Sequence, residues 1–409
     1  MTERAQESGG ADLLLPGDLF ASEALLSERE REIVLRVRGF LAEEVAPVVN
    51  DHWARAEFPH HLIKRFAELD IAGLPYGLSV GADGRVREVE PASELLNGFL
   101  ALELARVDAS IATFFGVHQG LAMGSVALTG SPEQRRRWLP DMARMERIGA
   151  FALTEPQSGS DIAGGLATTA RREGDEWVLD GRKKWIGNAT FADLVVVWAR
   201  DVADGQIKGF VVPGDAPGFT ATTIENKIAL RIVQNAEITL DGVRVPEADR
   251  LAGATGFKDT NDVLRQTRSG VAWESVGVMM GAYEAALSYA TRRDQFGRKL
   301  AQFQLVQDHL VRMLGDITSS LSLMVRLAQL QDAGVNRHNH AALAKAQVTT
   351  RMREVVARAR ELLGGNGILV DNDVARFFAD AEALYSYEGT REVNTLVVGR
   401  AITGHGAFV

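Results

Sequence analysis

The spacing of apolar residues changes twice along the chain and divides it into three parts. From about residue 27 to 147, apolar positions recur at helical intervals in segments such as EREIVLRVRGFLAEEV and ASELLNGFLALELARV. From residue 151 to about 245 the pattern becomes short β-branched runs such as EWVLD, LVVVWAR and EITLDGVRV, and Asp/Gly pairs typical of hairpin turns separate them. After about residue 257 the helical spacing returns. The order is helices, strands, helices.

We therefore predict an α+β protein with several domains. An all-α domain is expected at 27–148, an antiparallel β-barrel at 149–255 and a four-helix bundle at 256–409. The first 26 residues mix charged, polar and glycine positions without an apolar run, which predicts a flexible tail and no signal peptide. We expect no uncharged apolar stretch of membrane-spanning length, because two glutamates interrupt the segment from Val271 to Leu287.

Composition narrows the classes of function. The net charge is −9 and no cluster of basic residues stands out, which disfavours nucleic acid as a partner. The chain has no cysteine, so disulfides, thiolate metal ligands and cysteine nucleophiles are excluded. No histidines and acids show the spacing of a metal site. These features favour a cytoplasmic protein that has no membrane or metal partner.

Five short motifs carry the candidate chemistry. They are FALTEPQSGSD at 151–161, RKKWIGN at 182–188, RRDQFG at 292–297, ELLGGNG at 361–367 and YEGT at 387–390. Taken singly, each has an ordinary explanation. A loop rich in serine and glycine is usually only a loop, Trp185 suits a barrel core, and Glu388 suits the solvated start of a helix. The hydroxyls of Thr154 and Ser160 are also able to bind a flat cofactor.

Together and in this order, the motifs resemble the acyl-CoA dehydrogenase and acyl-CoA oxidase superfamily, from about residue 27 to the end of the chain. The segments DHWARAEFPHH, ARVDAS, WIGN, NKIALRIVQN and GRAITG are most similar to glutaryl-CoA dehydrogenases and to plant short-chain acyl-CoA oxidases. The resemblance implies FAD as the cofactor and an acyl-CoA as the substrate. It also implies electron-transfer flavoprotein or O2 as the electron acceptor, and a homotetramer built as a dimer of dimers.

The resemblance assigns the catalytic base to Glu388, which would remove a proton from the α carbon of the acyl group. Gly389 follows it and allows a close approach of the backbone to a ligand. Glu392, one helical turn further on, is the alternative base. The family motif places the base before the glycine, and it places the position of Glu392 toward the flavin.

The resemblance assigns a larger set of residues to the cofactor. Arginine suits a pyrophosphate because its donors form a planar fork. The set consists of Phe151, Leu153, Thr154, Ser160, Trp185, Ile186, Gly187, Glu361, Thr390 and Glu392, with Arg293, Phe296, Gln304, Gly364 and Gly365 in a cradle that neighbouring subunits share.

Five positions are expected to bind the substrate: Ser160, Arg268, Ala112, Thr113 and Gly389. Ala112 and Thr113 stand where glutaryl-CoA dehydrogenases carry the arginine and serine that bind the distal carboxylate. A buried carboxylate without its cation is strongly disfavoured, so a glutaryl substrate is not expected. The neighbours Ile111, Phe114 and Phe115 predict an apolar pocket for a short or medium unbranched chain.

Gly187 departs from many relatives, which carry a threonine there that bonds flavin N5. Its loss keeps two functions open, namely a dehydrogenase that forms trans-2-enoyl-CoA and an oxidase that reduces O2 to H2O2. A flavin monooxygenase on the same fold is a third possibility, although such relatives generally lack the base. A non-enzymatic acyl-CoA binder would need neither Glu388 nor the flavin motifs.

Overall fold

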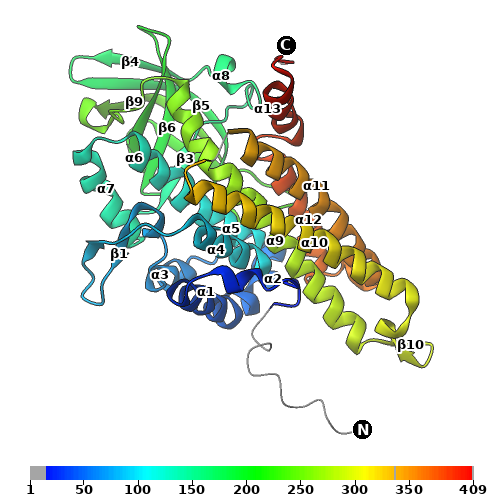
Figure 1. Ribbon diagram of the computed structural model, residues 1–409. Helices are drawn as coiled ribbons and strands as arrows, with labels where there is room; N and C mark the ends of the chain where they lie inside the picture. The colour runs from blue at the N-terminus through cyan, green and yellow to red at the C-terminus, as the bar shows by residue number, and fades with distance from the viewer. Residues whose placement is uncertain (1–14, 336–337, 408–409) are drawn as a thin grey trace.

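The computed structural model describes residues 15–335 and 338–407 and contains three domains (Figure 1). Three helices of the N-terminal domain begin at serine side-chain caps, which are Ser27, Ser93 and Ser131. The helices of the N-terminal domain are α1 (Glu28–Phe40), α2 (Ala46–Arg55), α3 (His61–Glu68), α4 (Glu94–Val107), α5 (Ala109–Gly116), α6 (Gly124–Thr129) and α7 (Pro132–Ala143). A short hairpin of β1 (Leu78–Val80) and β2 (Val86–Glu88) follows α3, and a π-helical stretch, η5 (Val117–Met123), joins α5 to α6.

The predicted flexible tail ends earlier than expected. Residues 1–14 lie outside the described part, but residues 15–26 pack on the protein and include the short helix η2 (Ser22–Leu25). The Asp18 carboxylate accepts the backbone N–H groups of Ser22 and Glu23. Glu23 is itself buried and forms an ion pair with Arg38 at 2.5 Å. The predicted tail boundary at residue 26 is therefore wrong. Polar contacts hold residues 15–26 on the protein, and an apolar pattern in the sequence does not reveal such contacts.

The middle domain is a curled sheet, and it is mixed where we predicted antiparallel pairing. Its strands are β3 (Gly149–Ala152), β4 (Thr169–Glu173), β5 (Glu176–Ile186), β6 (Leu194–Asp201), β7 (Ile207–Pro213), β8 (Phe219–Thr223) and β9 (Ala236–Pro246), with the short helix α8 (Ile162–Gly165) before β4. Their order is β3-β6-β4-β5-β9-β8, and β7 also pairs with β6. The pairs β3–β6 and β4–β6 are parallel. Turn signals between consecutive strands do not reveal pairings between strands that are distant in sequence.

The C-terminal domain is the predicted helical bundle. Its long helices α9 (Phe257–Arg292), α10 (Gln304–Asp332) and α11 (His338–Leu362) pack with α12 (Val374–Ser386), and α13 (Arg391–Thr403) packs on α11. A small hairpin, β10 (Asp294–Gln295) and β11 (Arg298–Lys299), joins α9 to α10 at one end of the bundle (Figure 1). Helix α9 lies directly on α4, where a Cβ on Gly277 would stand 2.2 Å from the Leu102 carbonyl oxygen.

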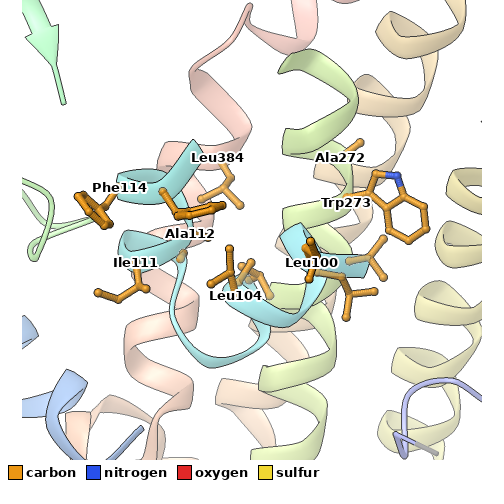
Figure 2. Close-up of a cluster of buried hydrophobic side chains, with 14 of the residues drawn as sticks. Leu100, Leu104, Ile111, Ala112, Phe114, Ala272, Trp273 and Leu384 are labelled. Carbon is orange, nitrogen blue, oxygen red and sulfur yellow. The ribbon is translucent and has the colours of Figure 1, made fainter. Parts of the chain in front are cut away.

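One apolar core joins the two helical domains. Figure 2 shows side chains from α4, α5, α9 and α12 meeting there, among them Leu104, Ala112, Trp273 and Leu384. The segment Ala109–Thr129 in this core is long and apolar enough to cross a membrane by length and composition. Our expectation that no such stretch exists was wrong for this segment. In the fold, 61% of an apolar stretch of 18 residues within it is buried, as in the core helix of a soluble protein.

Candidate active site

Glu388 lies in the turn between α12 and α13. Its backbone adopts a left-handed conformation (φ 54°), and so does that of Gly389 (φ 84°). For glutamate this conformation is unfavourable, and such backbone strain is concentrated at functional sites. Thr267 of α9 donates a hydrogen bond from Oγ1 to Glu388 Oε2 at 3.0 Å. The turn thus directs the Glu388 carboxyl at α9.

The surroundings of Glu388 act on its pKa in opposite directions. Loss of solvent around the carboxyl raises the pKa, and this effect outweighs the hydrogen bond from Thr267 and the charges of Arg268 and Lys345, which lower it. Arg268 is buried on α9, as its predicted place beside the substrate requires. The Glu388 carboxylate is therefore more basic than that of an exposed glutamate.

Two polar side chains hold the backbone beside the base. Lys345 of α11 is fully buried and donates from Nζ to the Gly389 carbonyl at 2.8 Å. Asn394 of α13 donates to the same oxygen at 2.8 Å and to the Thr390 carbonyl at 3.1 Å. Thr390 also caps α13 through its hydroxyl. Helices α11 and α13 therefore both hold the Glu388–Gly389 segment in place.

One face of the helix formed by α5 and η5 lines the site. A Cβ on Gly120 would stand 3.2 Å from Thr267 Cγ2, and a Cβ on Gly187 would stand 3.2 Å from Val117 Cγ2. Positions 117 and 120 lie one helical turn apart on the same face. Thr267, which bonds the predicted base, and Gly187, which follows Trp185, therefore contact this helix at neighbouring points. Two halves of one reaction site would have this arrangement.

The residues expected to form an apolar acyl pocket point elsewhere. Phe114 is fully buried and packs on Phe58 and Phe66 in the N-terminal core, and Phe115 stacks on Phe66. Ala112 is also buried (Figure 2). Phe114 and Phe115, two of the three side chains expected to form the acyl pocket with Ile111, therefore pack into the N-terminal core.

Polar groups stand on the face that does reach the site. The Thr113 and Tyr387 hydroxyls lie 3.4 Å apart, and Tyr387 donates to Glu274 Oε2 at 2.9 Å. Burial raises the pKa of the Glu274 carboxyl to about 7. Sequence reasoning missed Glu274. Its signal was a single acid within the apolar stretch SGVAWESVGVMM, which we had used only to argue against a membrane span.

Trp185 is the penultimate residue of strand β5 and has a conformation suited to a flat ligand. Its φ is 66° and its side chain is 54% exposed, in contrast with the barrel-core aromatic that was the alternative. Asn235 donates to its carbonyl at 3.5 Å, and the Lys184 ammonium lies 5.5 Å from the ring centroid. An exposed indole held in a strained backbone fits stacking on an aromatic ring.

The TEPQSGSD loop is anchored by a buried ion pair. Lys183 of β5 donates to the Leu153 carbonyl at 3.0 Å and to the Glu155 carboxylate at 2.8 Å. Glu155 also accepts two backbone N–H groups from the far side of the loop. Thr154 is half-buried and Ser160 is exposed, so both hydroxyls are available to a ligand.

Three other predicted cofactor residues are mainly buried. Phe151 packs on Trp198, Leu153 lies in the main core, and Ile186 lies in the core of the sheet. Apolar side chains in and beside strands turn toward the interior when the sheet packs. The side chains that stand at the surface here are those of Trp185, Thr154 and Ser160.

The remaining predicted cofactor residues lie far from Glu388 in the same chain. Helix α9 continues for 25 residues beyond Thr267 (292 minus 267), which at a rise of 1.5 Å is about 38 Å. Its far end carries an exposed group that includes Phe296 at 94% exposure. This group consists of Arg293, Phe296, Gln304, Glu361, Gly364 and Gly365. Glu392 is near Glu388 in sequence, but it is exposed in the first turn of α13 and pairs with Arg391.

Comparisons with known families cover all three domains. The chain matches the acyl-CoA dehydrogenase N-terminal domain at residues 27–146, the middle domain at 150–243 and the C-terminal domain at 254–403.

Relatives match over nearly their whole length. An acyl-CoA dehydrogenase of Bacillus subtilis (strain 168) is 31% identical over 92% of this chain and 98% of its own. The mitochondrial short-chain specific acyl-CoA dehydrogenase of Bos taurus is 32% identical over 91% of this chain and 90% of its own. The crystal structure of a glutaryl-CoA dehydrogenase from Mycobacterium smegmatis in complex with FADH2 is similar with a TM-score of 0.90. It is 34% identical and covers 97% of this chain and 100% of its own.

Proposed function

The chain belongs to the acyl-CoA dehydrogenase family, and we propose that it oxidises a short acyl-CoA to the trans-2-enoyl-CoA with Glu388 as the base. The observation that carries this proposal is the buried Glu388 carboxyl, held by Thr267 in a strained turn next to Gly389. Thr267 approaches the lining helix at Gly120, and Gly187 of the tryptophan motif approaches it at Val117, one turn away. Family membership makes the protein an FAD-dependent oxidoreductase of fatty acid metabolism.

The residues present fit the cofactor. Trp185 offers an exposed ring face to a flat ligand. Thr154 and Ser160 would supply hydroxyl donors, with Thr390 at the start of α13. FAD would accept the hydride from the β carbon, because no amino-acid side chain accepts a hydride.

The chain's own residues would activate the α hydrogen. Burial makes the Glu388 carboxylate a stronger base, while the Thr267 hydroxyl orients its accepting oxygen. The proton passes from the α carbon to Glu388. Lys345 and Asn394 hold the Glu388–Gly389 backbone, so that its amide is able to face the thioester carbonyl. Arg268 would complete the substrate side of the site.

Transfer of electrons to electron-transfer flavoprotein is the favoured second half of the reaction. A Cβ on Gly187 would stand 3.2 Å from Val117 Cγ2 and 3.7 Å from Val233 Cγ1. The absence of a threonine side chain therefore leaves little free space. Such packing argues against a widened path for O2. An oxidase remains the second candidate, supported by Gly187 itself.

A shared cofactor site would explain the two distant groups of predicted FAD residues. A separation of about 38 Å along α9 keeps the residues around Arg293 and Gly364 away from Trp185 of the same chain. A symmetric pairing of two copies would bring one group to the other. Exposed Phe296 and Ile368 are apolar residues that such an interface would cover. We propose a homotetramer of two such dimers, located in the cytoplasm.

Glu388→Gln tests the assignment of the base. The variant should bind FAD and butyryl-CoA, yet the rate of flavin reduction should fall by about 10²–10⁴-fold, the usual contribution of a general base. Anaerobic stopped-flow bleaching of the flavin measures it, with the exposed Glu28→Gln as the control. Near-normal reduction in Glu388→Gln would contradict the assignment. Readmitting air then separates an oxidase, which recolours quickly with peroxide, from a dehydrogenase.

A further inference from the structure

Glu274 is a buried acid that the proposed reaction does not use. It lies within α9, is only 7% exposed, and accepts a hydrogen bond from Tyr387 on Oε2. The Tyr387 hydroxyl in turn lies 3.4 Å from Thr113 Oγ1. Burying a carboxyl is costly, so a group kept in this setting calls for a physical reason.

The position of Glu274 relates it directly to the base. Thr267, Val271 and Glu274 follow each other at helical spacing on one face of α9. Seven residues (274 minus 267) separate the first from the last, which is about 10 Å along the axis. Thr267 bonds the base, so Glu274 lies about two turns further along the same face. That distance corresponds to the length of a short acyl chain.

The lining helix of α5 and η5 faces both Thr267 and Glu274. Gly120 stands against Thr267, and Gly116, one turn earlier, stands against Glu274, with an ideal Cβ 3.3 Å from Oε1. Because Gly116 has no side chain, the region in front of Oε1 is not filled from this wall. Glu274 and the Thr267 that bonds Glu388 therefore face the same glycine-bearing side of this helix, one turn apart along it.

One oxygen of Glu274 is open to a ligand. Tyr387 occupies Oε2, whereas Oε1 receives no hydrogen bond from the residues that the structure describes. The charged groups that act on this carboxyl are Glu388, which raises its pKa, and Lys345, which lowers it. An alkyl chain ending here would leave Oε1 without a partner in a dry site, and a terminal carboxylate would meet a second acid.

We propose that Glu274, with Tyr387 and Thr113, selects a short acyl chain that carries a terminal hydroxyl, in preference to an alkyl chain of the same length or a dicarboxylic acyl chain. A hydroxyl both donates and accepts, so it matches the carboxyl in either protonation state. This inference names the substrate class of the proposed dehydrogenase and rests on that function. Sites built to bond a hydroxyl discriminate strongly against analogues that lack it.

Three thioesters of matched length test the inference. They are 5-hydroxypentanoyl-CoA, its isostere hexanoyl-CoA, and glutaryl-CoA. In the FAD-loaded wild type, kcat/KM for flavin reduction should be about tenfold higher with the hydroxyl substrate than with hexanoyl-CoA, equivalent to about 1.4 kcal/mol. Glutaryl-CoA should be the poorest. Glu274→Leu should reverse the preference between the first two. Ser275→Ala, whose hydroxyl bonds the Val271 carbonyl on the same helix, should leave the ratio unchanged.

Binding measured by calorimetry gives a second readout that does not require catalysis. The ratio of the two dissociation constants should favour the hydroxyl substrate in the wild type and shift toward hexanoyl-CoA in Glu274→Leu and in the milder Glu274→Gln. Equal ratios in wild type and Glu274 variants, by both readouts, would overturn the inference. If no thioester reduces the flavin while the binding ratios shift as expected, the proposed function fails and the role of Glu274 in ligand selection stands.

Discussion

Replacing Thr267 by valine removes the hydroxyl that bonds the proposed base, with little change of volume. In the native structure Thr267 Oγ1 donates to Glu388 Oε2 at 3.0 Å and lies 3.2 Å from the Leu264 carbonyl. Valine keeps the branched shape at this helical position and cannot donate. The change therefore isolates the effect of a single hydrogen bond on the base.

The magnitude follows from the strength of a hydrogen bond to a charged group, about 1.5–3 kcal/mol. This bond lowers the pKa of Glu388, so its loss raises that pKa further. Below the pKa, fewer molecules then carry the ionised base, and flavin reduction should be slower by about tenfold or more. Above the pKa the carboxylate is ionised in both proteins, and their rates should agree within about threefold.

The assay is anaerobic stopped-flow reduction of the flavin by butyryl-CoA across the pH range in which the protein is folded. The acid limb of kcat/KM should move to higher pH in Thr267→Val. Thr318→Val on α10, whose hydroxyl bonds only the Leu314 carbonyl of its own helix, controls for the loss of a helical threonine. An unmoved acid limb with a lower plateau would refute the reasoning, since it would mean that Thr267 positions groups without affecting the ionisation of Glu388.

Three further substitutions test the surroundings of the site and the packing of α9. Lys345→Met removes a charge that lowers the pKa of Glu388 and a bond to Gly389, so flavin reduction near neutral pH should fall at least about tenfold, with the acid limb moved upward. Folding raises the pKa of Glu274 from 4.5 to about 7, so its charged form destabilises the fold. Glu274→Gln should therefore raise the free energy of unfolding in urea by on the order of 3 kcal/mol above pH 7, and the gain should vanish as the pH falls toward 4.5. Gly277→Ala forces a Cβ to within 2.2 Å of a backbone oxygen of α4 and should lower the unfolding free energy by about 1–3 kcal/mol or more.

Each of these changes has a matched control. Lys258→Met alters an exposed lysine at the start of α9 and should leave the pH profile unchanged. Glu28→Gln alters an exposed acid of α1 and controls for the loss of a glutamate. Gly270→Ala lies on the same helix as Gly277 with nothing within 4 Å of the new Cβ, and it should be neutral or stabilising by up to about 1 kcal/mol. Equal losses at Gly270 and Gly277 would contradict the packing argument.

The sequence was sufficient for the architecture and for the motifs. Helical spacing, hairpin turns and the return of helical spacing predicted three domains, and the family comparisons and the fold confirm that architecture. Ordered motifs identified the superfamily. The assignments of individual site residues stay predictions. The structure supports the surroundings expected for Glu388, Trp185 and Arg268 and leaves Phe151 and Ile186 mainly in the cores.

What the sequence by itself determined is what local pattern carries: the periodicity of each segment, the turns, the glycine-containing motif around Glu388 and the family. Only the tertiary structure decided which faces meet. Phe114 turns into the core and Thr113 toward Tyr387 because they are neighbours on a helix, about 100° apart. Glu274 reaches Tyr387, 113 residues away, only once α9 and α12 are packed. Such contacts depend on the relative placement of whole helices, which no local spacing encodes, and they determine the chemistry of the pocket.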